Sequence, residues 1–341
     1  MDAIVIAGGI PQPEDPLYTY SKGDAKALIE LAGKPMIQWV LDALNGASQV
    51  DNIILIGLSP KSEIQSLKPL HYVSNQGRML ANIVAGVNKA LELNNETKYV
   101  MVVSADIPAI KSHMVDWLVT TAMQTKDELY YGVCPRPVME KRFPGSKRTY
   151  IRLKDMEICG ADINITHVRM ATEHLDMWED LIDRRKNSLS QAAAIGLGTA
   201  FLLSTGQLTL ADAVERVCKR IGIKGRPIVW EYAEPAMDVD KPHQLELLRA
   251  DLTRQVRRAE QAKLGPARKK KPKNKVVKRA KKLIRRKTAR PKKRVAARRP
   301  VKKSPRPKKR TSTRRPASKT LRSKRKPVKK KVASRARSRR R

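Results

Sequence analysis

The residues best suited to chemistry begin with an aspartate that ends an apolar run. Asp106 directly follows the β-branched run at residues 99–105, which places it at the carboxyl end of an expected strand. Ligands of open α/β sheets bind beyond that end of the strands, and Mg²⁺ prefers one or two carboxylates together with phosphates and water. Asp106 is therefore a candidate Mg²⁺ ligand, and a helix-capping or turn aspartate is the equally weighted alternative.

Two further acidic residues precede the last expected helix, at residues 241–263. Asp238 and Asp240 alternate along the chain, so an extended backbone would point both carboxylates to the same side. They are candidates for the same kind of site as Asp106. Capping of the following helix by one of them is the competing interpretation.

Glycines and lysines near the N-terminus have the composition of a phosphate-binding loop. Gly8 and Gly9 come directly after the apolar run at residues 3–7, where their N–H groups could approach a phosphate. An ordinary turn between strand and helix explains a lone pair of glycines more often. Lys26 and Lys34 could neutralise a triphosphate as point charges, or they could be solvated surface residues.

A third candidate segment opens the expected helix at residues 78–93. Gly77 and Arg78 stand at its start, and Asn82 lies one turn inside it. The Asn82 amide could read the edge of a base or ribose, or lie exposed on the helix.

These candidates need a sheet to bring them together, and the sequence predicts one. Apolar, β-branched runs at residues 3–7, 52–58 and 99–105 are typical of strands buried on both faces. Helical periodicity at residues 35–47 and 78–93 separates them. Alternating strands and helices predict βαβ units, and so an α/β sandwich with a parallel sheet.

The pattern is looser after residue 110. Residues 129–137 and 226–232 are expected to be strands, and residues 172–222 are expected to be helical. An Ala/Gly-rich stretch inside the helical region is interpreted as a packing insertion or a lid. The final helix at residues 241–263 has Pro242 in its first turn, where the missing N–H costs nothing.

The charge divides the chain into two parts. Residues 263–341 hold 41 of the 72 Lys and Arg residues and lack Asp and Glu, which leaves residues 1–262 with 31 basic and 32 acidic residues. The basic tail has no aromatic residue from position 264 onward, so it is expected to be disordered. Residues 275–286 place apolar side chains on one helical face and could fold on an anionic partner.

The remaining composition favours a cytoplasmic protein. Three scattered cysteines fit neither a disulfide framework nor a zinc site. The N-terminus lacks the basic region of a signal peptide. The apolar stretch at residues 192–206 is shorter than the roughly 20 residues that a membrane span needs.

Taken in order, these residues resemble the MobA-like NTP transferases, relatives of molybdenum-cofactor guanylyltransferase and of sugar-phosphate nucleotidylyltransferases. The resemblance covers roughly residues 1–250. It is carried by the following segments: Ala7-Gly8-Gly9, Lys26-x-Leu28, Gly33-Lys34-Pro35, Gly77 to Asn82, Ser104 to Pro108, the Gly-rich stretch at 159–164 that ends in Asn164, and Asp238 to Pro242.

The resemblance implies a Rossmann-like nucleotide-diphospho-sugar transferase fold of the GT-A type, with a mixed, mainly parallel sheet. It also implies that Asp106 and Asp240 hold Mg²⁺ and that Lys26 lies close to the phosphates. An acceptor phosphate or hydroxyl would attack the α-phosphate of an NTP, GTP or CTP above all, and release pyrophosphate. Such chemistry depends on positioning and charge neutralisation.

Further roles follow from the same resemblance. Ala7, Gly8, Gly9, Gly77 and Asn82 would bind the nucleotide. Asn164 would lie near the acceptor.

One departure from the family concerns the loop after Gly9. The family follows its glycines with a Gly-x-Arg loop, whereas residues 10–25 form a longer Pro-rich insert without arginine. Lys22 is the candidate substitute. If the substitution fails, the alternative is a non-catalytic nucleic-acid-binding protein with a degenerate transferase domain.

The sequence therefore predicts three regions: a transferase-like domain at residues 1–250, the end of a helix at 251–262, and a basic tail at 263–341. The tail resembles those of linker-histone-like proteins. DNA is its first expected partner, before RNA and an anionic membrane surface. This partner would place the protein at the nucleoid.

Overall fold

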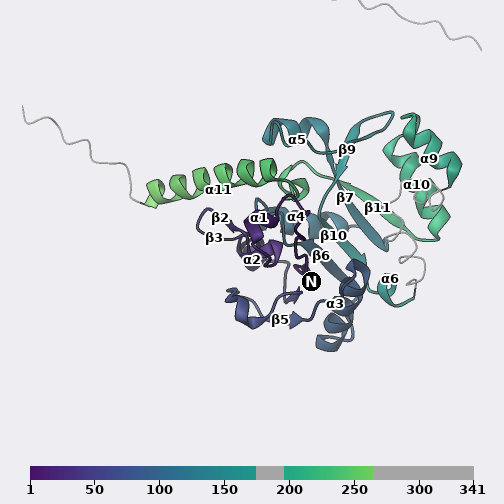
Figure 1. Cartoon of the computed structure of the whole chain (residues 1–341). Coiled ribbons are helices and arrows are strands. Elements are labelled where there is room, and N and C mark those ends of the chain that lie inside the picture. The colour runs from purple at the N-terminus through teal and green to yellow at the C-terminus, as the bar shows by residue number, and fades with distance from the viewer. Residues whose placement is uncertain (174–195, 264–341) are drawn as a thin grey trace, which may run out of the picture. The chain divides into compact units, whose positions relative to one another are not determined.

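Strands and helices alternate through the first half of the chain, as expected. The computed structural model describes residues 1–173 and 196–263, which belong to one compact unit (Figure 1). The expectations for the tail beyond residue 263, including the stretch at 275–286, lie outside the described residues. So does the part of the expected helical region at 174–195.

The strands of the described residues include the five that were expected, with ends shifted by a few residues, and six that were not. They are β1 (Asp2–Ile6), β2 (Glu30–Leu31), β3 (Lys34–Pro35), β4 (Ile53–Ile56), β5 (Leu70–Val73), β6 (Tyr99–Ser104), β7 (Leu129–Pro135), β8 (Ile151–Arg152), β9 (Glu157–Gly160), β10 (Ile163–His167) and β11 (Gly225–Val229). The expected ones are β1, β4, β6, β7 and β11.

The α-helices include all those expected within the described residues. They are α1 (Tyr18–Ser21), α2 (Met36–Gly46), α3 (Met79–Leu93), α4 (Ser112–Ala122), α5 (Arg136–Arg142), α6 (Arg169–Thr172), α9 (Leu197–Ser204), α10 (Leu210–Ile221) and α11 (Pro242–Lys263). Short 3₁₀ turns lie at η1 (Lys26–Leu28), η2 (Pro60–Ser62) and η4 (Glu234–Ala236).

The main sheet has the order β5-β4-β1-β6-β10-β7-β9-β8, with β11 pairing with β7. Strands β5, β4, β1 and β6 are parallel, and β11 is parallel to β7. Strand β10 runs antiparallel to both β6 and β7. The mixed sheet is confirmed, and its parallel half puts the carboxyl ends of β1, β4 and β6 at one edge.

Both faces of the parallel half are covered, as the continuous apolar runs predict. Along β1, Ala3 and Val5 join the core beneath α2 and α4, whereas Ile4 packs with Val87 of α3 on the other face. Helix α3 comes close to the sheet because Gly86 has no side chain: a Cβ there would lie 2.5 Å from Cγ2 of Ile4.

The C-terminal elements pack onto this sheet. Helix α10 contacts β11, and α9 lies beside α10 (Figure 1). Helix α11 begins at Pro242, and its residues Leu245, Leu248 and Leu252 are fully buried in the core. Each buried leucine contributes about 1.5–3 kcal/mol relative to exposure. The helix is thus anchored at least as far as residue 252, past the domain end expected at residue 250.

Candidate active site

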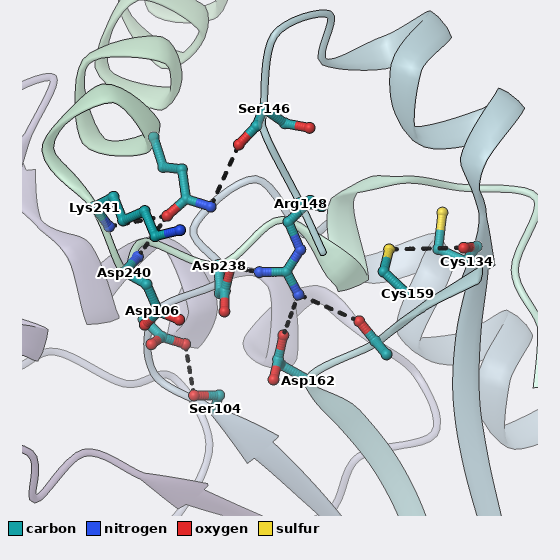
Figure 2. A network of polar contacts seen from close by, with 12 residues as sticks. Ser104, Asp106, Cys134, Ser146, Arg148, Cys159, Asp162, Asp238, Asp240 and Lys241 are labelled. Atoms are coloured by element: carbon teal, nitrogen blue, oxygen red, sulfur yellow. Dashed lines mark hydrogen bonds and ion pairs between the residues drawn. The ribbon is translucent and has the colours of Figure 1, made fainter. Parts of the chain in front are cut away.

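Asp106 lies where the sequence places it, directly beyond the end of β6. Its Oδ1 accepts a hydrogen bond of 2.6 Å from the Ser104 hydroxyl (Figure 2). Its main-chain oxygen accepts a 3.1 Å bond from the N–H of Val239. The aspartate is therefore held both to its own strand and to the acidic segment that precedes α11.

Lys26 connects the two candidate metal ligands. Its Nζ lies 2.6 Å from Oδ2 of Asp106 and 2.8 Å from Oδ1 of Asp240. Burial opposes the charge of this lysine, but the two carboxylates outweigh burial and raise the pKa of Lys26 above its ordinary value. Burial likewise opposes the charge of Asp240, yet Lys26 outweighs it and lowers the pKa of that carboxyl.

The two ends of the insert at residues 10–25 lie next to each other, so the insert does not move Lys26 away from Gly9. The N–H of Lys26 donates a 2.9 Å hydrogen bond to the main-chain oxygen of Gly9. Buried Leu17 fixes the insert to the core. The insert is therefore a closed loop beside the site, and Lys26 starts η1 at the mouth of the glycine turn.

Lys22 is not brought to the carboxylates. It ends α1 in the left-handed conformation, with φ 54°, and its side chain is exposed. Within the described residues it makes no side-chain hydrogen bond and no ion pair. The expected substitution for the family's arginine stays a prediction.

Two small cavities meet at Gly9 and Lys26. One cavity, of about 210 Å³, reaches Asp240 and is lined by five residues of the insert: Ile10, Pro11, Asp15, Pro16 and Leu17. The other, of about 180 Å³, is lined by Ala7 and by residues 104–106. Gly9 and Lys26 thus border both cavities, one of which reaches Asp240 and the other Asp106.

Close backbone contact explains why the turn after β1 needs glycine. Gly57 has φ +95°, and a Cβ on it would lie 2.2 Å from Cα of Gly8. A Cβ on Gly8 would itself meet the Asn75 side chain. In the part of the chain that the structure describes, no hydrogen bond uses the N–H of Gly8 or Gly9. Those amides are available to a ligand.

The predicted nucleotide residues Gly77 and Asn82 belong to one network with Gly8. Asn75 donates to the main-chain oxygen of Gly8 at 2.9 Å, and its Oδ1 accepts from Gly77 N–H at 2.9 Å and Asn82 Nδ2 at 3.1 Å. The Asn82 Oδ1 accepts from Gln76 N–H at 2.7 Å. Asn82 is therefore buried beneath the 75–77 loop and shapes it.

Asn164 is placed in the sheet, away from the lysine. It lies on β10, where its Oδ1 accepts a 2.9 Å bond from the N–H of Gly132 and its Nδ2 donates to the Ala161 main-chain oxygen at 3.4 Å. Its side chain fastens β10 to β7. The neighbouring Asp162 lies on the same side of the sheet end as Arg148, Asp238 and Asp106 (Figure 2).

Beside Lys26 and its two aspartates lies a second group of charged side chains around Arg148, and it was not predicted. Arg148 pairs with Asp238 and has a guanidinium nitrogen 3.9 Å from Oδ2 of Asp162. Burial, together with nearby Asp106, raises the pKa of Asp162 to about 7. The sequence gives little signal for Arg148, because Lys147 and Arg152 beside it are equally basic.

The other lysine of interest has a structural role. Lys34 pairs with Asp42 of α2, and its ammonium lies 3.8 Å from the centre of the Trp39 ring. Both contacts stabilise the start of α2. Lys34 is not among the residues that line the two cavities beside Lys26.

A parallel sheet with a glycine turn after its first strand and a lysine between two aspartates at its carboxyl edge defines a nucleotide-binding α/β domain. The chain belongs to the MobA-like NTP transferase family, whose domain matches residues 3–269.

Relatives and a solved structure agree with this assignment. A probable molybdenum cofactor guanylyltransferase of Thermococcus gammatolerans is 30% identical over 98 residues, 29% of this chain and 48% of that protein. The molybdenum cofactor guanylyltransferase of Shewanella piezotolerans is 27% identical over 129 residues, 38% of this chain and 58% of its own length. The matched segments thus span about half of these relatives.

The fold is shared more widely than these segments. A hypothetical transferase from Thermus thermophilus superimposes with a TM-score of 0.62 and 28% identity, over 72% of this chain and 98% of that one. Within the described residues, no helix is long and apolar enough to cross a membrane.

Proposed function

We propose that the protein is a nucleotidyltransferase that moves a nucleoside monophosphate from an NTP to a phosphorylated or hydroxyl acceptor. The observation that carries the proposal is the Lys26 ammonium held between Asp106 and Asp240. These three residues come from distant parts of the chain and meet at the glycine turn. GTP and CTP are the expected nucleotides, and the named relatives, which are guanylyltransferases, support GTP.

The two aspartates fit a Mg²⁺ ion. The Lys26 ammonium shows that both carboxylates reach a single cation, and their oxygens are the hard ligands that Mg²⁺ prefers. Among the described residues, no group of three or more His, Cys, Asp or Glu side chains could hold a metal alone. A site of two carboxylates leaves the other positions to phosphate oxygens and water. When bound, Mg²⁺ would neutralise phosphate charge and hold the phosphates in place.

The reaction needs little covalent work from the protein. The acceptor oxygen forms a bond to the α-phosphorus while the bond from that phosphorus to the bridging oxygen breaks, and pyrophosphate leaves. Lys26 would supply positive charge to the phosphates, and the free N–H groups of Gly8 and Gly9 would donate to their oxygens. The Asn75 network would shape the nucleotide loop around Gly77 and Asn82.

The acceptor is expected on the side of β9 and β10. Asp162 lies there beside Arg148, and Asn164 fixes β10, the strand that starts directly after Asp162. Both residues belong to the segment that resembles the acceptor region of the family.

The test is pyrophosphate release with each of the four NTPs against sugar phosphates, other phosphorylated acceptors and molybdopterin. Turnover that requires Mg²⁺ and one acceptor would support the proposal. If no combination releases pyrophosphate while the protein binds nucleic acid, the non-catalytic alternative with a degenerate transferase domain is the better account.

For the tail we propose a second function, the tethering of the transferase domain to DNA or RNA. The supporting observation is the excess of 41 positive charges over residues 263–341, without a carboxylate. Counterion release favours binding of such a segment to any polyanion. Without aromatic side chains it has no platform for base stacking, so little sequence preference is expected. A protein tethered in this way would be associated with the nucleoid.

A further inference from the structure

Arg148 connects two segments that come from opposite sides of the proposed site. It belongs to the loop at residues 143–150 between α5 and β8. Its side chain is 14% exposed, and its charged partner Asp238 is 10% exposed. Figure 2 shows the guanidinium between Asp238 and Asp162, with Asp106 and Asp240 beyond Asp238.

The first contact of Arg148 fixes the segment that carries Asp240. Arg148 donates to Oδ1 of Asp238, two residues before Asp240. Between them, the N–H of Val239 is bonded to the main-chain oxygen of Asp106. The backbone that presents the Asp240 carboxylate is thus held from both sides.

The same loop holds this segment at a second point. The main-chain oxygen of Ser146 lies 3.1 Å from Nε2 of His243 and accepts a 3.5 Å bond from Gln244 Nε2. Oε1 of Gln244 in turn accepts hydrogen bonds from the N–H groups of Asp240, at 3.0 Å, and Lys241, at 2.9 Å. The loop therefore determines where α11 starts as well as where Asp240 lies.

The second contact of Arg148 reaches the acceptor side. Its guanidinium donates to the main-chain oxygen of Gly160 at 3.4 Å and lies 3.9 Å from the Asp162 carboxylate. Gly160 ends β9, and Asp162 precedes β10. The planar guanidinium offers several N–H donors in a fixed fork to these three partners, whereas a lysine ammonium would present a single point charge on a flexible chain.

We propose that Arg148 is a positioning residue that couples the acceptor-side segment at 160–162 to the placement of Asp240. The proposal rests on the proposed function, since it assigns Asp240 a metal. Stability alone is a poor reason for this ion pair, because a buried pair seldom stabilises a fold more than apolar residues of the same size. Groups that orient metal-binding side chains, by contrast, affect metal affinity by 10–100-fold.

The test removes the pair without changing the net charge. The double variant R148M/D238N deletes one positive and one negative group, so Asp238 is not left as an uncompensated buried charge, and Asp162 loses the guanidinium 3.9 Å from it. R152M is the matched control, because Arg152 is an exposed arginine four residues further along. Mn²⁺ serves as the probe for the Mg²⁺ site. Its binding in the presence of GTP is followed by the loss of the free-ion electron paramagnetic resonance signal.

We expect the double variant to fold and to bind Mn²⁺ about tenfold more weakly than the wild type, at the low end of the range for such groups. Amide hydrogen exchange should quicken in both the 157–162 and the 237–244 segments, whereas R152M should match the wild type in both measurements. R148K should restore the charge and recover only part of the Mn²⁺ affinity.

Three outcomes decide against the proposal. Wild-type Mn²⁺ affinity in the double variant would show that Arg148 only neutralises Asp238. Faster exchange in the 237–244 segment alone would remove the coupling to the acceptor side. If the wild type itself shows no GTP-dependent Mn²⁺ binding, the proposed function fails, and the role of Arg148 fails with it.

Discussion

Three charged side chains, each from a different part of the chain, account for the proposed chemistry at the scale of single residues. Asp106 and Asp240 were predicted from their places next to a strand and a helix. Lys26 was placed close to the phosphates by the family resemblance. The resemblance implied that the two carboxylates share one metal ion, but the direct contact of both with the Lys26 ammonium, at 2.6 and 2.8 Å, was not predicted. It depends on the bond that returns the insert to Gly9 and on the backbone contact between Val239 and Asp106.

Replacement of Asp106 by Asn tests the metal assignment. D106N keeps the size of the side chain but loses the charge that faces Lys26. We expect Mg²⁺-dependent pyrophosphate release to disappear while the melting temperature stays within a few degrees. D42N is the control, because Asp42 makes a comparable lysine pair on α2. Normal turnover by D106N, or its unfolding, would show that Asp106 is not a metal ligand.

The raised pKa of Asp162 predicts how the stability of the protein depends on pH. The pKa of this carboxyl is raised to about 7 in the folded protein, whereas the unfolded chain releases this proton near the ordinary value of 3.8. Between about pH 4 and 7 the folded state therefore binds more protons, so the contribution of this group to stability falls as pH rises. D162N cannot titrate. Its free energy of unfolding, relative to that of the wild type, should increase from pH 4 to 7 and level off above.

Denaturant unfolding of both proteins at unit pH steps measures this difference. Parallel stability curves for the wild type and D162N would mean that the pKa of Asp162 is not raised.

At the scale of elements, the sequence was most informative where periodicity was strong. The β-branched runs predicted β1, β4 and β6, and helical spacing predicted α2 and α3, because both faces of that sheet are buried. Periodicity does not reveal the order of strands. It therefore gave no sign that β10 would lie antiparallel between β6 and β7, or that a loop after α5 would bring Arg148 inside.

The crossing of the turns after β1 and β4 predicts a sensitive position at Gly57. G57A would place a Cβ against the backbone of Gly8 and would also strain a residue with φ +95°. We expect a lower melting temperature and weaker GTP binding. G222A is the matched control: Gly222 also has positive φ, 72°, but has open space around it. Equal loss of stability in the two variants, with unchanged GTP binding, would show that the close approach is unimportant.

The insert makes a separate prediction about Lys22. If Lys22 supplies the charge that the family takes from an arginine, K22A should weaken NTP binding by roughly 1.5–3 kcal/mol, the range for a hydrogen bond to a charged group. Isothermal titration with GTP gives the value, and K126A provides an exposed lysine as control. Unchanged affinity for GTP in K22A would show that other residues, Lys26 first among them, bind the triphosphate.

At the scale of the whole molecule, the boundary given by the charge and the boundary given by the family match differ by several residues. The family match extends to residue 269, and α11 continues to Lys263, whereas the basic excess starts at residue 263. The transferase part thus includes the core that the described residues form, and the tail overlaps the family match only at residues 263–269. Independent functions for the two parts are expected.

A chain that ends at Ala262 should fold, bind NTP and keep the activity of the full chain, because the anchoring leucines of α11 are retained. The full chain should bind unrelated DNA sequences with similar affinity. Contact with ~8 phosphates would give a slope of log K against log salt of about −7 on duplex DNA. Turnover assays and salt titrations of both chains measure this. Loss of turnover on truncation, or DNA binding that survives it, would contradict the division.

The hydrogen bond between Gly9 and Lys26 has a consequence for how this protein can change. It fixes the two ends of the insert, so a change in the length of chain between them would leave Gly9 and Lys26 in place. Doubling a flexible loop costs only about 0.6 kcal/mol in closure entropy. The insert can therefore change length at a low cost in closure entropy, whereas its residues that line the cavity, Ile10 and Leu17 among them, shape the entrance to the site. For the same reason it is the natural place to graft a fluorescent reporter that senses the arrival of a nucleotide.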